Sequence, residues 1–185
     1  MYPPLLVFAT IQHMLDYKIQ ILTKERAEKY SGEITISLDQ IPMTDKHSKE
    51  QLLSDTKVDR VLYGKWEHSI IMLTSDNEYI GVAICYERKA EGNEQYPHNC
   101  IYLNDFAICA SHQKKGLGKI LLKEWIDHNT KIGLVHLPGD TIFAVQTNGA
   151  DWNLYVQKLY ENAGFKKIAE KNYPNRVDNV YFLGD

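Results

Sequence analysis

The chain contains 185 residues, of which 44% are hydrophobic and 24% are charged, and its formal net charge is −3. A chain of this length can bury a core without disulfides or a structural metal, so we expect a single domain over residues 1–185, with 1–30 as an N-terminal elaboration. The near balance of charges argues against a protein dedicated to nucleic acid, which carries a strongly basic surface.

Neither the N-terminal residues nor the cysteines indicate export or membrane insertion. The apolar run at 5–9 is far shorter than the roughly 20 residues that cross a bilayer, and no basic residue precedes it as in a secretory signal. Cys85, Cys100 and Cys109 are an odd number of cysteines in strand-like surroundings. They are typical of reduced thiols, so we expect a cytoplasmic protein with no membrane or nucleic-acid partner.

Apolar spacing in the first half of the chain predicts short helices and strands. Residues 33–41 (EITISLDQI) alternate apolar and polar side chains and are rich in β-branched residues, which predicts a strand. Two apolar runs around an Asx-rich turn, 69–74 and 79–86, predict a β-hairpin. The other expected segments are a helix at 5–16, a strand at 17–23, a helix at 24–30, helical spacing within 46–65 and a polar loop at 87–99.

The second half predicts strands and helices around a loop that contains two glycines. Residues 100–110 (CIYLNDFAICA) predict a buried strand, and residues 120–129 follow with helical periodicity. A helix at 153–163 is expected to end at Gly164, where a left-handed glycine terminates many helices. Further strands are expected at 141–147 and 179–183.

The loop after the strand at 100–110 has the features of an anion-binding site. N–H groups in the first turn of a helix have no partner within the helix, and the helix dipole adds positive charge there. Gly116 and Gly118 lack Cβ atoms, which lets phosphate oxygens approach the backbone. An ordinary turn between strand and helix is the alternative. Lysines at 114, 115 and 119 add positive charge to the same loop.

The spacing within this loop narrows the kind of phosphate ligand. The lysine after Gly118 is not followed by Ser or Thr, and no glycine stands three residues past Gly118, so neither a nucleotide-triphosphate loop nor a dinucleotide fingerprint is present. The pattern Gln113-x-x-Gly116-x-Gly118 resembles the Q/R-x-x-G-x-G/A motif of the GCN5-related N-acetyltransferase (GNAT) family. A second segment, 159–165 (LYENAGF), is similar to the L-Y-x-x-x-G-F segment of that family, and Asn153 precedes its tyrosine by seven residues.

This resemblance implies a fold, a cosubstrate and a reaction. The implied fold is an α/β sandwich with a mixed, mostly antiparallel sheet of about seven strands, flanked by helices and splayed between the strands at 100–110 and 141–147. Acetyl-CoA would donate its acetyl group directly to a primary amine in a ternary complex. The residues implied to bind acetyl-CoA are Phe106, Ala107, Ile108, Ala110, Gln113, Lys114, Lys115, Gly116, Leu117, Gly118, Lys119, Asn153 and Tyr160.

The resemblance also implies groups that move protons and stabilise charge. Tyr160 matches the tyrosine that protonates the departing thiolate, with a packed core tyrosine as the alternative, and a backbone N–H near Ile108 would stabilise an oxyanion. The attacking amine is protonated at neutral pH, so a base or a water chain must take its proton. Asn104 and Asp105 are the candidate catalytic residues on the strand at 100–110, and Asp105 is its only carboxylate. Strict alternation places it on the face opposite Tyr102 and Asn104 unless a bulge intervenes.

Recognition of the acceptor is expected near the strand at 141–147. We expect Gln146 and Tyr102 to face the acceptor, and the Asn-Gly turn within 146–152 (QTNGADW) to place Asp151 and Trp152 beside the substrate mouth. The seven histidines show no metal-binding spacing, so no metal is expected. The alternative function is a CoA-binding sensor or interaction module that retains the pocket without turnover. We expect a monomer or a homodimer.

Overall fold

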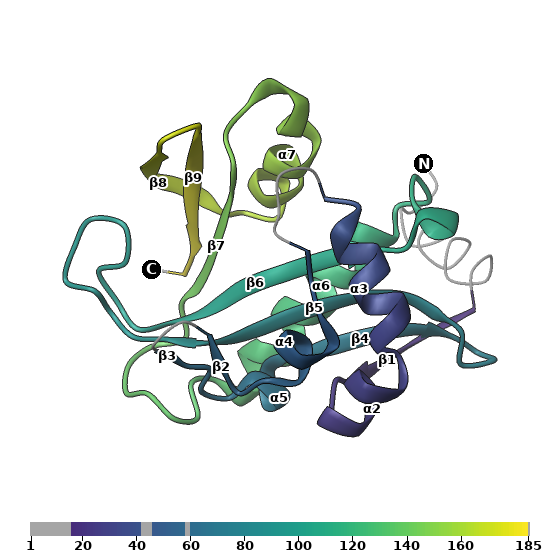
Figure 1. Ribbon diagram of the computed structural model, residues 1–185. Helices are drawn as coiled ribbons and strands as arrows, with labels where there is room; N and C mark the ends of the chain where they lie inside the picture. The colour runs from purple at the N-terminus through teal and green to yellow at the C-terminus, as the bar shows by residue number, and fades with distance from the viewer. Residues whose placement is uncertain (1–15, 42–45, 58–59, 185) are drawn as a thin grey trace, which may run out of the picture.

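A twisted seven-stranded sheet forms the centre of the computed structural model, which describes residues 16–41, 46–57 and 60–184 (Figure 1). Its strands are β1 (Tyr17–Ile21), β4 (Ile70–Thr74), β5 (Tyr79–Arg88), β6 (Cys100–Ile108), β7 (Phe143–Asn148), β8 (Lys166–Tyr173) and β9 (Arg176–Leu183). Their order in the sheet is β1-β4-β5-β6-β7-β9-β8. β6 and β7 pair in parallel, and every other neighbouring pair is antiparallel. The expected mixed, mostly antiparallel sheet is confirmed.

Helices cover both faces of this sheet (Figure 1). α3 packs Ile34 and Leu38 into the core on one face, and α6 packs Leu117 and Trp125 into the core on the other. No helix of the described residues is long and apolar enough to cross a bilayer. The helices are α2 (Lys24–Lys29), α3 (Ser31–Asp39), α4 (Lys49–Leu53), α5 (Lys65–His68), α6 (Leu117–Ile132) and α7 (Leu154–Asn162), with 3-10 turns η1 (Ala110–His112) and η2 (Asp151–Asn153) and a small hairpin β2 (Thr56–Lys57) and β3 (Arg60–Val61).

The strand expected at 33–41 is wrong, because this segment forms α3. Its buried residues are Ile34, Ser37 and Leu38, which recur at three and four residues, whereas Ile36 is 65% exposed. The alternating β-branched residues suggested a strand, but the helix buries a serine on its inner face, and a count of apolar residues does not register that position. Ser37 is satisfied there by Tyr79, whose hydroxyl lies 2.8 Å from the serine hydroxyl.

The segment 46–65 is helical only in part. α4 begins with a capping box in which Ser48 and Gln51 bond each other's backbone N–H groups. The chain then forms the β2–β3 hairpin before α5 begins at Lys65. The Lys65 ammonium is buried and donates to the carbonyl oxygens of Leu52 (2.6 Å) and Ser54 (2.7 Å), which satisfies the C-terminal end of α4.

The strand expected at 17–23 and the helix expected at 24–30 are confirmed as β1 and α2. The helix expected at 5–16 lies outside the described residues apart from Asp16.

The C-terminal third contains more strand than its sequence pattern indicated. β7 continues to Asn148, where it pairs with Asp178 of β9, so residues 146–148 belong to the sheet. β9 begins at Arg176, three positions before the expected strand. β8 was not expected, because it is an edge strand with mostly exposed, charged side chains and has no apolar alternation.

Candidate active site

The sheet opens between its two parallel strands. β6 and β7 pair only at Ile101–Phe143, Tyr102–Ala144 and Leu103–Val145. Beyond these pairs β6 continues to Ile108 alongside β5, while β7 continues alongside β9. The two strands therefore diverge after Leu103, which confirms the expected splay between the strands that contain 100–110 and 141–147.

A β-bulge at Asn104 coincides with the point of divergence. Ile84 of β5 lies opposite Asp105, and the next residue of β5 lies opposite Leu103, so Asn104 is an extra residue in β6. An extra residue reverses the alternation of side chains beyond it. Asp105 therefore lies on the same face of the sheet as Tyr102, because their partners Ile84 and Tyr86 share a face of β5.

The edge of β6 that faces the opening carries backbone N–H groups that have no strand partner among the described residues. The N–H of Cys109 donates to the carbonyl of Ile80 in β5 at 2.8 Å. Successive residues of an extended strand direct their N–H groups to opposite edges, so the N–H groups of Ile108 and Phe106 point away from β5. They face the opening, where β7 no longer pairs with β6.

The loop before α6 forms a cradle of backbone donors. Lys114 (φ 61°) and Gly116 (φ 78°) both adopt left-handed conformations. Among the described residues the N–H groups of 114–118 find no acceptor, whereas those of Lys119 and Ile120 donate to the carbonyl of Gly116. Such an alternation of backbone conformations makes a concave anion site at a helix N-terminus. Three lysines at 114, 115 and 119 surround it with exposed side chains.

The cradle is open where a ligand would lie. A Cβ atom built on Gly116 would have no heavy atom within 4 Å, and one on Gly118 would meet only side-chain atoms of Ile108 and Phe106 at 3.9 Å. Leu117 is buried and anchors the first turn of α6. Gln113 closes the end of β6, since its amide nitrogen donates to the carbonyl of Ile108 at 2.9 Å. The open space and the free donors fit a diphosphate group.

Tyr160 lies in the core cluster that also contains Leu103 and Val145. Its ring packs against Phe165 and Tyr181, with ring centroids 5.8 and 6.3 Å away. Within the part of the chain that the structure describes, its hydroxyl makes no hydrogen bond, although the residue is only 4% exposed. Burial raises the pKa of this phenol, so it holds its proton at neutral pH.

The structure places Gln146 and Tyr102 on one face of the sheet, each among polar or aromatic neighbours. The Gln146 amide accepts from the Tyr96 hydroxyl (3.0 Å) and donates to the Tyr173 hydroxyl (2.9 Å) and to Asp178 (2.7 Å). Tyr102 is 8% exposed and packs edge-on against Tyr96. Tyr96 and Asp178 lie in a polar loop and an edge hairpin, where no motif predicts them as site residues.

Asn153 and the two residues before it lie at the start of α7. The Asn153 amide nitrogen donates to the Thr147 hydroxyl (2.8 Å) and to the carbonyl of Asn148 (2.7 Å), and so holds the end of β7. Asp151 and Trp152 form the 3-10 turn in front of it and are exposed, Trp152 by 51%. The structure therefore brings Asn153 to the β7 side of the opening and leaves the other two at the surface.

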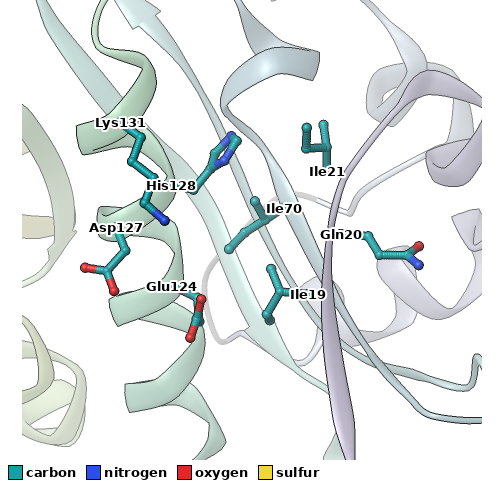
Figure 2. Close-up of a pocket in the computed structure, with 8 residues that line it drawn as sticks. All are labelled: Ile19, Gln20, Ile21, Ile70, Glu124, Asp127, His128 and Lys131. Atoms are coloured by element: carbon teal, nitrogen blue, oxygen red, sulfur yellow. The ribbon is translucent and has the colours of Figure 1, made fainter.

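A separate surface pocket lies at the far edge of the sheet (Figure 2). Ile19 and Ile70 form its floor, and Glu124 and His128 reach over it from α6. β5 lies between β4, whose Ile70 lines this pocket, and β6 beside the opening, so the pocket is not part of the candidate active site. Across the described residues, no group of three or more His, Cys, Asp or Glu side chains is arranged to hold a metal ion.

The open parallel pair and the loop of backbone donors beside it are the features that the comparison with known families places in context. The model of the Acetyltransferase (GNAT) family matches residues 36–165. The chain belongs to this family and is an acetyl-CoA-dependent N-acetyltransferase. No curated protein sequence gives a significant match.

Solved structures show the same fold at low sequence identity. One is the NatC complex bound to Gag peptide and CoA, with 16% identity, 91% of this chain and 98% of that chain covered, and a TM-score of 0.68. Another is the ribosomal-protein-S18-alanine N-acetyltransferase from Escherichia coli, with 16% identity, coverage of 90% and 92%, and a TM-score of 0.60. A third is a spermidine N-acetyltransferase chimera from Vibrio cholerae and hSSAT, with 16% identity, coverage of 91% and 95%, and a TM-score of 0.60.

Proposed function

We propose that this enzyme moves the acetyl group of acetyl-CoA directly to a primary amine of a peptide, protein or small molecule in a ternary complex. The observation that carries the proposal is the continuity of backbone donors from the cradle at 114–118 to the N–H groups of Ile108 and Phe106 along the open edge of β6. A cosubstrate with a diphosphate at one end and amide groups along its length matches that row of donors. Acetyl-CoA, when bound, supplies an activated thioester carbonyl.

The N–H and ammonium groups at the opening bind the polar groups of acetyl-CoA that water would otherwise hydrate. The N–H groups of 114–118, with Lys114, Lys115 and Lys119, hold the diphosphate, and Phe106, Ala107 and Ala110 line the path from it into the opening. Ile108 directs its N–H into the opening and stabilises negative charge on the carbonyl oxygen. A preorganised donor of this kind contributes about 3 kcal/mol to catalysis.

Two side chains from opposite faces of the sheet carry the proton transfers. Tyr160 donates its proton to the departing thiolate, which its position in the cluster of Leu103 and Val145 supports. Asp105 accepts the proton of the attacking amine. The bulge at Asn104 supports this role, because it turns the carboxylate to the face of Tyr102 and Gln146 at the point where the strands part.

The acceptor approaches on that same face, between the bulge and the β8–β9 hairpin. Gln146, Tyr173 and Asp178 form a hydrogen-bonded group there that can orient an amine. Asp151 and Trp152 extend the surface beyond β7, and Asn153 holds that strand in place. Similar structures are named for a bound peptide and for spermidine, which supports an acceptor of either class.

Calorimetry followed by a turnover assay tests the proposal. Acetyl-CoA and CoA should each bind with micromolar affinity, and ATP should not bind. Thiol release from acetyl-CoA is then measured with peptides that have a free amino terminus, with spermidine and with an aminoglycoside, and at least one should accelerate it. Absence of binding by both CoA species would overturn the proposal. Binding without amine-dependent thiol release across the panel would favour the sensor function.

A further inference from the structure

A row of polar side chains joins the bulge of β6 to the segment that follows α3. His47 lies between two carboxylates, with its Nδ1 3.1 Å from Asp39 Oδ1 and its Nε2 3.5 Å from Asp105 Oδ1. Asp39 also accepts the backbone N–H of His47 at 2.8 Å, which fixes the histidine against the end of α3. The His47 and Asp105 side chains are 21% and 22% exposed, so the row is shielded from solvent and still reachable by it.

Asp105 is oriented by the bulge residue on its other side. The side-chain Nδ2 of Asn104 donates to Asp105 Oδ2 at 2.6 Å. The side-chain Oδ1 of Asn104 accepts from the Lys57 ammonium at 3.3 Å. The lysine fixes which way the amide points, because an ammonium group can only donate. One carboxylate oxygen of Asp105 therefore faces Asn104 and the other faces His47. The row ends where β6 and β7 part.

We propose that His47 relays the acceptor's proton: it takes from Asp105 the proton that Asp105 removes from the amine, and Asp39 stabilises the resulting imidazolium. The inference rests on the proposed function. An N–H bond of the ammonium breaks as an O–H bond forms on Asp105, and that proton then moves to the lone pair of His47 Nε2. Nδ1–H of His47 stays bonded to ionised Asp39, the imidazolium releases a proton to solvent, and no electrons are transferred. His47 acts through Asp105 and is a positioning residue.

The charges around His47 determine its pH dependence. Its interaction with Asp105 outweighs the opposing effect of burial and, with the interaction with Asp39, raises the pKa of His47. Lys46 lies near Asp39, and Lys57 and Lys65 lie on the side of Asp105. His47 must be neutral to receive a proton, so kcat should rise with pH as His47 loses its charge. Because the pKa of His47 is raised, this rise should occur at a higher pH than the ordinary histidine value of about 6.5.

Three variants separate a relay from a structural contact. Turnover is measured from pH 5.5 to 9 with the most active amine of the acceptor panel, and acetyl-CoA affinity by calorimetry. His47→Gln should lower kcat about tenfold or more and abolish the rise with pH, with affinity for acetyl-CoA unchanged within about twofold. Asp39→Asn should move the rise to lower pH, because it removes a carboxylate that favours the imidazolium. His98→Gln changes an exposed loop histidine in the same way and should match the wild type.

Two outcomes overturn the relay without touching the proposed function. One is a His47→Gln enzyme with kcat within about twofold of wild type and an unchanged profile. The other is measured by NMR without an acceptor: the pH midpoint of the His47 titration is the same in the wild type, in Asp39→Asn and in Asp105→Asn. A rise of that midpoint above about 6.5 in the wild type and a fall in both variants supports the relay. A wild-type protein that binds neither acetyl-CoA nor CoA would overturn the proposed function and the relay with it.

Discussion

Leu103 and Val145 form the last pair between β6 and β7. Each strand is held from its outer side, β6 by β5 and β7 by β9, so the sheet stays intact where its centre opens. Among the described residues, the opening leaves the partly buried N–H groups of Phe106 and Ile108 in β6 without a strand partner, and such donors require one. Under the proposed function, the amide groups of acetyl-CoA would satisfy them.

Gly118→Trp should abolish acetyl-CoA binding. A Cβ at this position would make ordinary contacts of 3.9 Å with Ile108 and Phe106, so an indole beyond it would fill the space above the cradle. We expect affinity to fall about 100-fold or more, which corresponds to about 2.7 kcal/mol. Calorimetry measures this loss. Gly32→Trp is the control, because a Cβ on that glycine of α3 meets nothing within 4 Å. Wild-type affinity in Gly118→Trp would contradict the placement of the cradle.

Tyr160→Phe should lower turnover and leave acetyl-CoA binding intact. The variant removes a hydroxyl that makes no hydrogen bond to the described residues, so the core keeps its packing. We expect kcat to fall about 10- to 100-fold, with the dissociation constant unchanged within about twofold. Tyr181→Phe is the matched control, since that ring contacts Tyr160 but its hydroxyl bonds Glu161. If both variants retain full turnover, Tyr160 is a core residue and not the acid.

Glu87→Gln should destabilise the fold at neutral pH, and the difference in stability between the variant and the wild type should shrink in acid. Burial alone would raise the pKa of Glu87, but hydrogen bonds from His68 (2.8 Å) and from the backbone N–H groups of 135–137 outweigh it and lower the pKa. A carboxyl group with a lowered pKa in the folded state stabilises above its ordinary pKa, and the stabilisation is lost as pH falls through the folded value. We expect a loss of about 3 kcal/mol or more at pH 7 in urea unfolding.

The same experiment requires a control for the loss of any glutamate charge. Glu67→Gln removes a half-exposed carboxylate that lies 3.5 Å from His136. Exposed pairs contribute less than about 1 kcal/mol. A Glu87→Gln protein whose stability differs from wild type equally at pH 4 and pH 7 would refute the linkage of Glu87 to acid unfolding.

Lys65→Met should flatten the dependence of stability on alkaline pH. Burial lowers the pKa of Lys65 to about 8, whereas an unfolded lysine titrates near about 10.4. The folded state binds fewer protons than the unfolded state between these values, so Lys65 makes stability rise with pH in that window. Urea midpoints at pH 8 and pH 10 measure the rise. Lys158→Met, an exposed change on α7, should keep the wild-type slope, and an unchanged slope in Lys65→Met would refute the assignment.

The parts of the site that follow from sequence are those built by adjacent residues. The cradle depends on Gly116 and on the helix that begins behind it, and both are visible as local spacing. Tyr160 and Asn153 are likewise placed by one helix and its first turn. These features require no knowledge of which segments meet, because helix ends present their free N–H groups whatever packs against them.

Other features depended on contacts between distant segments. Glu33, Ile34 and their neighbours alternate like a strand, and α3 forms because Leu38 and Ile34 are buried against the sheet. The bulge at Asn104 carries no sequence signature, since an extra residue is defined only by the strand opposite it. Strict alternation therefore placed Asp105 on the wrong face.

Local spacing by itself determined the glycine loop before α6, the helix that contains Tyr160 and the family of the chain. Only the tertiary structure decided where Asp105 points and that His47, 58 positions earlier in the chain, lies between it and Asp39. The physical reason is that backbone geometry acts over a few residues, whereas the face of a strand and the partner of a carboxylate are set by whichever segments pack around them.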